Sequence, residues 1–369
     1  MTVYYIPIEP LEERYTESWY RNIPFYLKEL GDVIIVDGDA LSTFVETGTF
    51  LDINSTVHYK SSQLKKISEL FYKKLVKPND IFFIADIEFW GIESIRFLAH
   101  LQNIPVKIYG FCHAASYTTE DFMEPSAPYS KYFELGWIAA FDMVFVGSKY
   151  HKDAIISRRI VPYVNDKNEV DLLSKKIIVT GNPFFQNDYN SVLLSPPKKK
   201  KQIIISNRFD WEKRPNLSLD FCYILKRRIP DLSIIVTTSR PHFKSNKSWL
   251  VEMARWMETD GIIKIYDGLS KGEYHYHLAE SKVFLTNTIE ENFGYCLLEA
   301  LLYNTYPVAE NKFSHPEILD YQKPFLFNDT DEIIEKVITL LSSEYDVSYL
   351  ARHYFDSMHK IVKIISNNI

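Results

Sequence analysis

The sequence predicts an α/β protein built from two doubly wound domains. Short apolar segments typical of buried strands alternate with helix-like segments along the chain, which is the pattern of helices packed on parallel sheets. The alternation stops once, at the Pro- and Lys-rich segment 190–202, and then restarts. A length of 369 residues also exceeds one ordinary domain and suits two domains of roughly 150 to 200 residues each.

We therefore expect an N-terminal Rossmann-like domain over residues 1–190, a C-terminal Rossmann-like domain over residues 191–345 and a closing helix over residues 346–369. The two domains are expected to face each other across a central cleft. Ligands of doubly wound sheets bind at the carboxyl ends of the strands. The residues that follow each strand are therefore the first candidates for a site.

Each half of the chain contains five segments typical of buried strands. In the first half they are 32–39, 80–88, 105–113, 142–148 and 176–183; in the second half they are 202–208, 232–239, 262–268, 282–287 and 306–311. Helix-like segments such as 17–31 and 91–103 lie between them. Each strand therefore alternates with a helix, as a doubly wound sheet requires.

Composition narrows the class of protein further. No run approaches the roughly 20 apolar residues of a membrane span. The first residues carry Pro and Glu where a signal peptide needs a basic end and an apolar run. Cys112, Cys222 and Cys296 are isolated, lack metal-ligand spacing and suit buried thiols in a reducing compartment. We expect a cytoplasmic protein.

The charge distribution bears on the partners. The net charge is −6, and all of it falls in residues 1–190. An acidic first half is a poor platform for nucleic-acid backbones. Segment 64–78 nevertheless has apolar residues at helical spacing with lysines between them. A solvated helix face is the favoured interpretation, and contact with an anionic membrane or with DNA phosphates is the alternative.

Two cations follow the first strand of the second half. Arg208 and Lys213 come after the strand end at Asn207 and before a helix that begins near Asn216. A forked guanidinium, a point-charge ammonium and a helix N-terminus together form a clamp for a diphosphate. Taken alone, this segment suits a solvated loop with surface cations better.

The stretch "EENFGYCLLEA", residues 290–300, adds two carboxylates. A helix beginning near Phe293 and Gly294 would direct its free N–H groups at an anion, and Gly294 lets the backbone approach closely. Glu291 and Glu299 would accept hydrogen bonds from hydroxyl groups. A ligand with a diphosphate flanked by hydroxyls is a nucleotide-sugar.

Together these segments resemble the retaining glycosyltransferases of the GT-B fold that carry an E-x7-E motif, in group 1 and similar to family 4. Asn207 stands where the family has a glycine in "NRFDWEKRPN", Asn287-Thr288 matches its Pro-Ser, and the motif runs from Glu291 to Glu299. The later strand and Pro-Glu match "YPVAENKFSHPEIL". The resemblance covers about residues 201–319.

The resemblance implies a set of site residues. Arg208 and Lys213 would hold the diphosphate, Glu291 the donor sugar and Glu299 the ribose, with Tyr266 to Leu269 near the nucleobase. The catalytic set is Glu291, Arg208, Lys213 and His113; the donor-binding set is Asn207, Tyr266, Leu269, Thr288, Asn292, Phe293, Gly294, Tyr295 and Glu299. His113 ends the strand 105–113, where family members often contact the donor sugar; a hydrogen-bonded packing role is the alternative.

The sequence also departs from the family. The N-terminal glycine-rich turn is replaced by "IEPLEERYTESWY", and "YNTYPV" lacks the glycine that usually precedes the proline. Only "FDMVFVGSKYHKDAI" in the first half matches a family pattern, and weakly. The approach of the first domain to the phosphates is therefore the least supported part of the resemblance.

A possible metal motif lies in the first half. Asp37 and Asp39 form an Asp-x-Asp after the second strand, a metal signature in the other major glycosyltransferase fold. Asp-Gly is also an ordinary turn, which we favour because the motif lies far from the diphosphate residues. We expect no metal and no cofactor besides the donor substrate.

The function predicted from these observations is transfer of a hexosyl or pentosyl group, with retention, from a nucleotide-diphosphate sugar to a hydroxyl acceptor. The acceptor could be a saccharide, a lipid-linked sugar or a modified DNA base. Segment 4–20 faintly resembles bacteriophage glycosyltransferases, some of which act on hydroxymethylated DNA bases. A non-catalytic sugar-nucleotide-binding protein or a nucleotide-sugar epimerase could also be built on the same fold.

Overall fold

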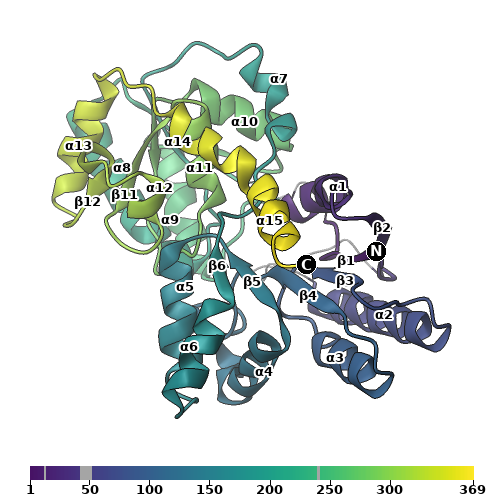
Figure 1. Cartoon of the computed structure of the whole chain (residues 1–369). Helices are drawn as coiled ribbons and strands as arrows, with labels where there is room; N and C mark the ends of the chain where they lie inside the picture. Colours follow the sequence, from purple (N-terminus) through teal and green to yellow (C-terminus); the bar gives the residue numbers. More distant parts are fainter. Residues whose placement is uncertain (12–13, 42–51, 239–241) are drawn as a thin grey trace. The chain divides into compact units, whose positions relative to one another are not determined.

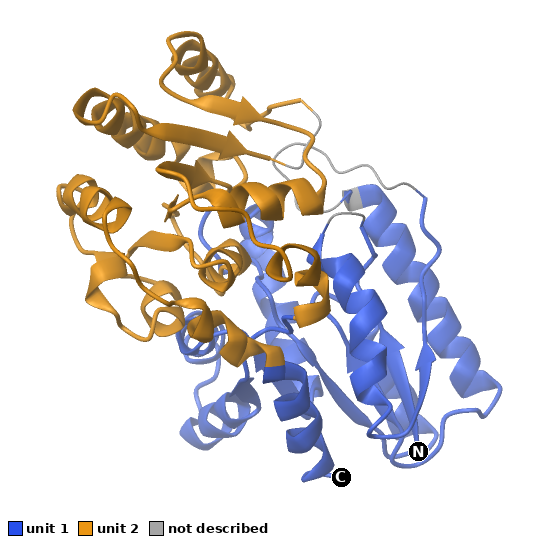
Figure 2. Cartoon of the chain, turned by 90° about the horizontal axis from the view of Figure 1, so that it is seen from above, with its two compact units in different colours: residues 1–184, 356–369 blue, residues 185–355 orange. Residues whose placement is uncertain are grey.

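The computed structural model describes residues 1–11, 14–41, 52–238 and 242–369. These residues form two compact units, Met1–Phe184 together with Asp356–Ile369, and Phe185–Phe355 (Figure 2). The sequence predicts boundaries between residues 190 and 191 and between residues 345 and 346. The structure instead divides the chain after Phe184 and after Phe355, so the last helix belongs to the N-terminal unit.

The N-terminal unit contains a parallel sheet of six strands in the order β2-β1-β3-β4-β5-β6. The strands are β1 (Thr2–Ile6), β2 (Asp32–Ile35), β3 (Ile81–Ile84), β4 (Lys107–Phe111), β5 (Met143–Val146) and β6 (Ile177–Val179). The helices are α1 (Tyr15–Leu27), α2 (Ile53–Tyr72), α3 (Ile92–Leu101), α4 (Ala127–Ala140), α5 (Lys149–Ile155), α6 (Lys167–Lys175) and α15 (Ser357–Ser366), and a π-helical turn η2 (Ile156–Ile160) continues α5 (Figure 1).

Both faces of this sheet are covered by helices, as the doubly wound prediction requires. Successive residues of β1 point to opposite faces. Tyr4 stacks on Phe82 and belongs to the core shared with α2, α3, α4, α5 and α6. Tyr5, on the other face, donates a hydrogen bond to the Trp19 carbonyl of α1 at 3.4 Å. Helix α15 packs beside α1, where the His359 and Tyr26 rings are 4.9 Å apart.

The basic segment 64–78 is mostly part of α2, which ends at Tyr72 rather than continuing to residue 78. Ile67 and Phe71 are fully buried in the core, and Leu75 lies beyond the helix end. Ile67 and Phe71 are therefore turned to the core, whereas Leu75 is 52% exposed. Lys65 and Lys73 are exposed, as the favoured interpretation of a solvated face expects.

The C-terminal unit contains a second parallel sheet, in the order β12-β11-β10-β7-β8-β9. Its strands are β7 (Gln202–Ile205), β8 (Ser233–Thr237), β9 (Lys264–Tyr266), β10 (Val283–Leu285), β11 (Tyr306–Glu310) and β12 (Leu326–Phe327). Its helices are α7 (Asn190–Leu193), α8 (Pro215–Arg228), α9 (Ser248–Thr259), α10 (Lys271–Glu280), α11 (Tyr295–Leu302), α12 (His315–Ile318), α13 (Glu332–Leu341) and α14 (Ser348–Arg352).

Every one of the ten predicted strand segments contains a strand, and the structure adds β1 and β12. The predicted segments are longer than the strands because they include the residues that follow each strand. The closing helix is interrupted: α14 belongs to the C-terminal unit, a short 3-10 turn follows, and α15 belongs to the N-terminal unit. Among the helices of the described residues, none combines the length and apolarity that crossing a membrane requires.

Candidate functional site

The candidate site lies where β7 and β10 end, in the C-terminal unit. These two strands are neighbours, so their carboxyl ends place two loops side by side. Asn207, after β7, donates a hydrogen bond to the Thr286 hydroxyl at 3.0 Å. The Ile289 amide donates to the Glu212 carbonyl at 2.8 Å, and the Thr288 hydroxyl donates to the same carbonyl at 3.2 Å. Hydrogen bonds therefore join the loop after β7 to the loop after β10.

Lys213, from the loop after β7, contacts Glu291, from the loop after β10. The Lys213 ammonium donates to Glu291 Oε2 at 2.9 Å, although the two residues are 78 positions apart. Burial favours the neutral form of Glu291, but the ammonium outweighs this effect and holds the pKa of the carboxyl below its usual value. Glu291 is therefore an ionised carboxylate at neutral pH.

Arg208 has a carboxylate partner that the sequence analysis missed. Its guanidinium lies 2.9 Å from the Glu212 carboxylate and remains about one-third exposed. The two residues are close in sequence, but Arg208 lies in the loop after β7 and Glu212 in the short 3-10 turn that follows, so no helical pattern indicated the contact. Both predicted diphosphate cations are thus oriented by carboxylates in this structure.

Helix α11 begins at Tyr295, as the predicted start near Phe293 and Gly294 anticipated. Gly294 precedes it with a φ of +84°, a left-handed conformation that side-chain-bearing residues rarely adopt. The Phe293 side chain is buried, with its ring edge-on to those of Tyr295 and Tyr354. Asn292 is buried as well.

Glu299 lies inside α11 and is held by an aromatic cluster. Its Oε2 accepts a hydrogen bond from the Tyr274 hydroxyl at 2.8 Å, and its Oε1 accepts one from Tyr189 at 3.3 Å. His275 Nε2 is 3.8 Å from Oε1. Burial favours the neutral acid, but His275, Lys271 and Tyr274 together lower the pKa of Glu299. Sequence analysis missed these partners because they come from other elements.

Tyr266 is the last residue of the edge strand β9, and Leu269 follows it in the next loop. The Tyr266 ring packs on His277 at 4.4 Å, and the Lys264 ammonium lies 4.6 Å from its centroid. The Leu269 amide donates to the Thr238 carbonyl at 3.3 Å, which ties the segment to the end of β8. The segment is half-buried and exposes part of an aromatic ring.

His113 belongs to the N-terminal unit, where it follows β4. Its Nε2 forms a hydrogen bond with the Ala85 carbonyl at 2.9 Å, and its ring packs on Trp19 at 4.6 Å and on Tyr15 at 5.4 Å. Burial lowers its pKa, so the imidazole is neutral. These contacts are those of the packing alternative; a contact with a donor sugar stays a prediction.

Asp37 and Asp39 both have protein partners. Asp37 accepts hydrogen bonds from the hydroxyls of Tyr20, at 3.0 Å, and Tyr59. Asp39 pairs with the Lys66 ammonium at 2.8 Å. The two carboxylates therefore serve to fix α1 and α2 against the end of β2.

The sequence of this C-terminal segment matches a family model. Residues 191–356 match the model of glycosyl transferases group 1. A tRNA-queuosine alpha-mannosyltransferase of Drosophila melanogaster is 27% identical over 136 residues, which is 37% of this chain. The match spans about a third (34%) of that relative's length.

Solved structures with the same fold extend over both units. A lipopolysaccharide outer core galactosyltransferase matches 100% of both chains with a TM-score of 0.66 and 13% identity. An α,α-trehalose-phosphate synthase (UDP-forming) from Burkholderia vietnamiensis covers 99% of each chain with a TM-score of 0.63 and 9% identity. At such identities the likeness shows the fold. The prediction of a GT-B fold around a group 1 domain is confirmed.

Proposed function

We propose that this protein is a glycosyltransferase that moves a sugar from a nucleotide-diphosphate sugar to a hydroxyl acceptor. The observation that carries the proposal is the Lys213–Glu291 pair, set on interlocked loops beside the left-handed Gly294 in the group 1 domain. A partly exposed, ionised carboxylate beside a cation and a helix start suits a ligand that is both anionic and hydroxylated.

The two cations would stabilise charge on the diphosphate. When a donor binds, Arg208 and Lys213 would exchange carboxylate partners for phosphate oxygens, and the N–H groups at the start of α11 would add a partial positive charge. Because both cations already lie beside the site before the donor binds, the diphosphate would meet positive charge in place as it gains charge. Glu291 would then accept hydrogen bonds from the sugar hydroxyls.

We infer retention of the anomeric configuration from the E-x7-E spacing of Glu291 and Glu299. In the proposed step the bond from the anomeric carbon to the diphosphate oxygen breaks, and a bond from the acceptor oxygen forms on the same face of the sugar. The acceptor proton passes to the departing diphosphate. This assignment leaves Glu291 as a positioning carboxylate rather than a nucleophile, consistent with its pairing to Lys213.

The comparisons suggest which substrates to test first. The structure of a pneumococcal O-GlcNAc transferase that matches 84% of this chain, with a TM-score of 0.53 and 12% identity, is a complex with UDP and GlcNAc; this chain covers 60% of it. UDP-sugars are therefore the first donors to test. The tRNA-queuosine relative adds a modified nucleoside to the acceptors to be tested, beside saccharides and lipid-linked sugars.

The test combines a donor screen with product analysis. Thermal-shift measurements with a panel of nucleotide-sugars should identify a stabilising donor, and mass spectrometry should then find an acceptor heavier by one sugar residue. NMR of the product anomeric proton checks retention. A donor that is epimerised in the absence of acceptor would assign the protein to the epimerases. Donor binding with neither hydrolysis nor transfer would assign it to the binding proteins.

A further inference from the structure

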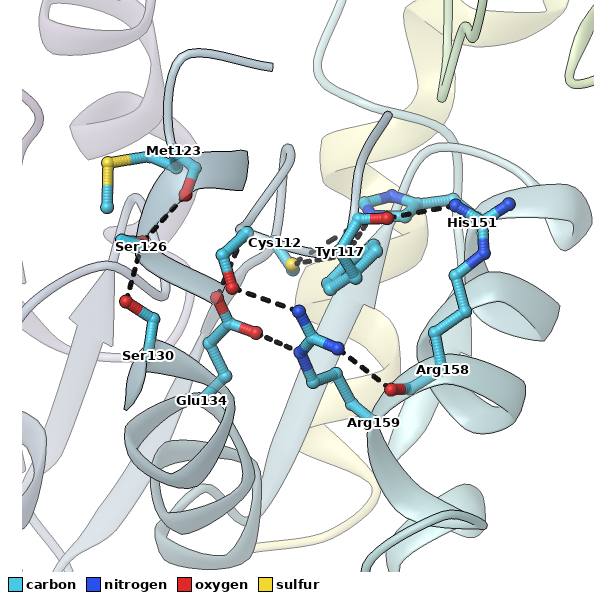
Figure 3. A network of polar contacts seen from close by, with 10 residues as sticks. Cys112, Tyr117, Met123, Ser126, Ser130, Glu134, His151, Arg158 and Arg159 are labelled. Carbon is cyan, nitrogen blue, oxygen red and sulfur yellow. Dashed lines mark hydrogen bonds and ion pairs between the residues drawn. The ribbon is translucent and has the colours of Figure 1, made fainter. Parts of the chain in front are cut away.

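Helix α4 of the N-terminal unit buries two polar residues, Ser130 and Glu134, beside the core residue Ile138. Figure 3 shows Glu134 turned inward to the guanidinium of Arg159, with which it forms a buried ion pair, and Ser130 turned to Ser126. Arg159 also donates to the Ser116 hydroxyl at 2.9 Å. The inner face of α4 thus carries the helix's only carboxylate.

The outer face of α4 is apolar. Its exposed residues are Pro128, Tyr129, Tyr132, Phe133, Gly136 and Ala139, and each residue of this helix is described by the structure. Tyr129, Tyr132 and Phe133 are 61%, 62% and 57% exposed. A surface helix of a monomeric domain normally carries polar and charged residues on its outer face.

Helix α3 continues this surface, as its position beside α4 in Figure 1 shows. Phe97 and Leu101 are one helical turn apart and also largely exposed. Arg96 donates to the Ala140 carbonyl at 2.6 Å, and the Trp137 indole donates to Glu93 at 2.9 Å. These bonds lock the two helices together. We call the eight residues Phe97, Leu101, Pro128, Tyr129, Tyr132, Phe133, Gly136 and Ala139 the aromatic face.

The eight residues of the aromatic face are uncharged, and the exposed carboxylate next to them, Glu93 of α3, is an anion rather than a cation. Nucleic acid needs several cations opposite its phosphates, and a membrane-surface helix pairs its apolar face with a strongly basic one. Lys131 is the one cation of α4, and its ammonium lies over the rings of Tyr132 and Tyr163, 5.1 and 5.4 Å from their centroids. The aromatic face therefore suits a partner whose contact surface is also apolar.

The aromatic face is complementary to itself. Its large side chains, Tyr129, Tyr132 and Phe133, occupy the first part of α4, and its small residues, Gly136 and Ala139, occupy the last part. A Cβ added to Gly136 would meet no heavy atom within 4 Å, so the space above it is open. Two α4 helices packed antiparallel would set the rings of each copy over the small residues of the other.

We propose that the aromatic face is the contact surface of a symmetric dimer, in which α4 packs antiparallel against α4 of a second copy of this chain. A two-fold axis between Phe133 and Gly136 makes the contact isologous, as in most dimers. The proposal is independent of the proposed catalytic function, because none of these residues belongs to the candidate site.

The available area suits a dimer. Four aromatic rings that are each about 60% exposed offer roughly 400 to 600 Å². Leu101, Pro128, Gly136 and Ala139 bring the aromatic face toward the roughly 800 Å² per partner of a standard interface. A reversible dimer is therefore expected rather than an obligate one.

Sedimentation velocity of the full chain over a wide dilution range tests the proposal. The wild-type protein should sediment as a dimer that dissociates on dilution. Gly136→Leu, which fills the open space, and Phe133→Ser, which removes a ring, should each raise the dimer Kd by about tenfold or more. Leucine is a better helix former than glycine, so Gly136→Leu should leave the monomer folded.

Phe25→Ser is the matched control, because Phe25 is an exposed aromatic residue on α1 of the same unit. Its dimer Kd should equal that of the wild type. Circular dichroism should show the same helix content in all variants. A wild-type protein that is monomeric at every concentration overturns the proposal, as does a dimer that both α4 variants leave unchanged. Binding of wild-type monomer to phosphatidylserine vesicles, lost in Phe133→Ser, would instead assign the face to membranes.

Discussion

Glu291 and Glu299 flank one helix start but have different surroundings, and this difference predicts different kinetic roles. Glu291 pairs with Lys213, next to the expected diphosphate, whereas Glu299 is buried among tyrosines. Misplacing a group near the reacting carbon harms the chemical step, whereas losing a remote contact weakens ground-state and transition-state binding alike. Glu291→Gln should mainly lower kcat, and Glu299→Gln should mainly raise the donor KM. Steady-state kinetics with varied donor separates the two effects.

Titration calorimetry with UDP gives a second measurement for the same pair. UDP affinity should fall in Glu299→Gln and change little in Glu291→Gln, because UDP lacks the sugar. Tyr274→Phe should resemble Glu299→Gln in a weaker form, since it removes the 2.8 Å hydrogen bond that orients this carboxylate. If UDP affinity instead falls in Glu291→Gln and is unchanged in Glu299→Gln, the roles of the two glutamates are exchanged.

The predicted diphosphate cations can be tested by truncation. Arg208→Ala and Lys213→Ala should each cost about 2 to 4 kcal/mol of transition-state stabilisation, as does removal of other preorganised donors. The ratio of kcat/KM values measures this cost. Lys201→Ala is the matched control: Lys201 also pairs with a carboxylate, Asp231, but precedes β7 rather than following it. Near-normal turnover in both test variants would place the diphosphate elsewhere.

At the scale of elements, the start of α11 depends on one glycine. Gly294→Ala forces a residue with a Cβ into the left-handed region and should lower the free energy of unfolding by about 1 to 2 kcal/mol. Gly261 also has a positive φ, +70°, but follows α9 away from the site. Urea unfolding should show a similar loss for Gly261→Ala. UDP affinity should fall only in Gly294→Ala.

The ion pair of Glu134 and Arg159 joins α4 to the π-helical turn η2 and to the segment after β4 (Figure 3). Glu134 also accepts a hydrogen bond from the Ser116 amide at 2.8 Å. Removing one partner leaves a buried charge without its counterion. Glu134→Ala should therefore lower the free energy of unfolding by about 3 to 5 kcal/mol. Asp231→Ala, which breaks the exposed Lys201 pair, should change it by less than about 1 kcal/mol.

At the scale of the whole molecule, a buried histidine makes stability depend on pH. Burial, with a smaller effect of His113, lowers the pKa of His151 to about 3 from 6.5. Below pH 6.5 the unfolded chain binds a proton at His151 that the folded protein does not. Stability contributed by the neutral imidazole is therefore present above pH 6.5 and is lost progressively as the pH falls toward 3.

The expected slope is up to about 1.4 kcal/mol per pH unit for one such histidine. Urea unfolding of the wild type and of His151→Gln at about pH 7 and about pH 5 isolates the contribution of His151. This comparison is needed because burial raises the pKa of the Glu88 carboxyl to about 8, which gives a pH dependence of the opposite sign in the same range. His151→Gln should flatten the dependence while lowering stability throughout, since the Tyr117 hydroxyl lies 2.6 Å from His151 Nε2. An unchanged slope in this variant would assign the dependence to other groups.

The sequence by itself determined the features that depend on local pattern. Apolar runs set the ten predicted strands, and the Phe293-Gly294 pair set the start of α11, because burial and turn conformation act over a few neighbouring residues. The motif spacing was also sufficient for the GT-B fold, which residues 191–356 and the solved structures confirm.

Only the tertiary structure decided which side chains meet. Strand order brings Lys213 to Glu291, 78 positions away, and Tyr189 to Glu299, 110 positions away. It also returns α15 to the N-terminal unit and turns the carboxylate of α4 inward to Arg159, leaving aromatic rings outside. These contacts depend on which elements pack together. Sequence periodicity predicts which face of an element is buried, but it does not predict which other element covers that face.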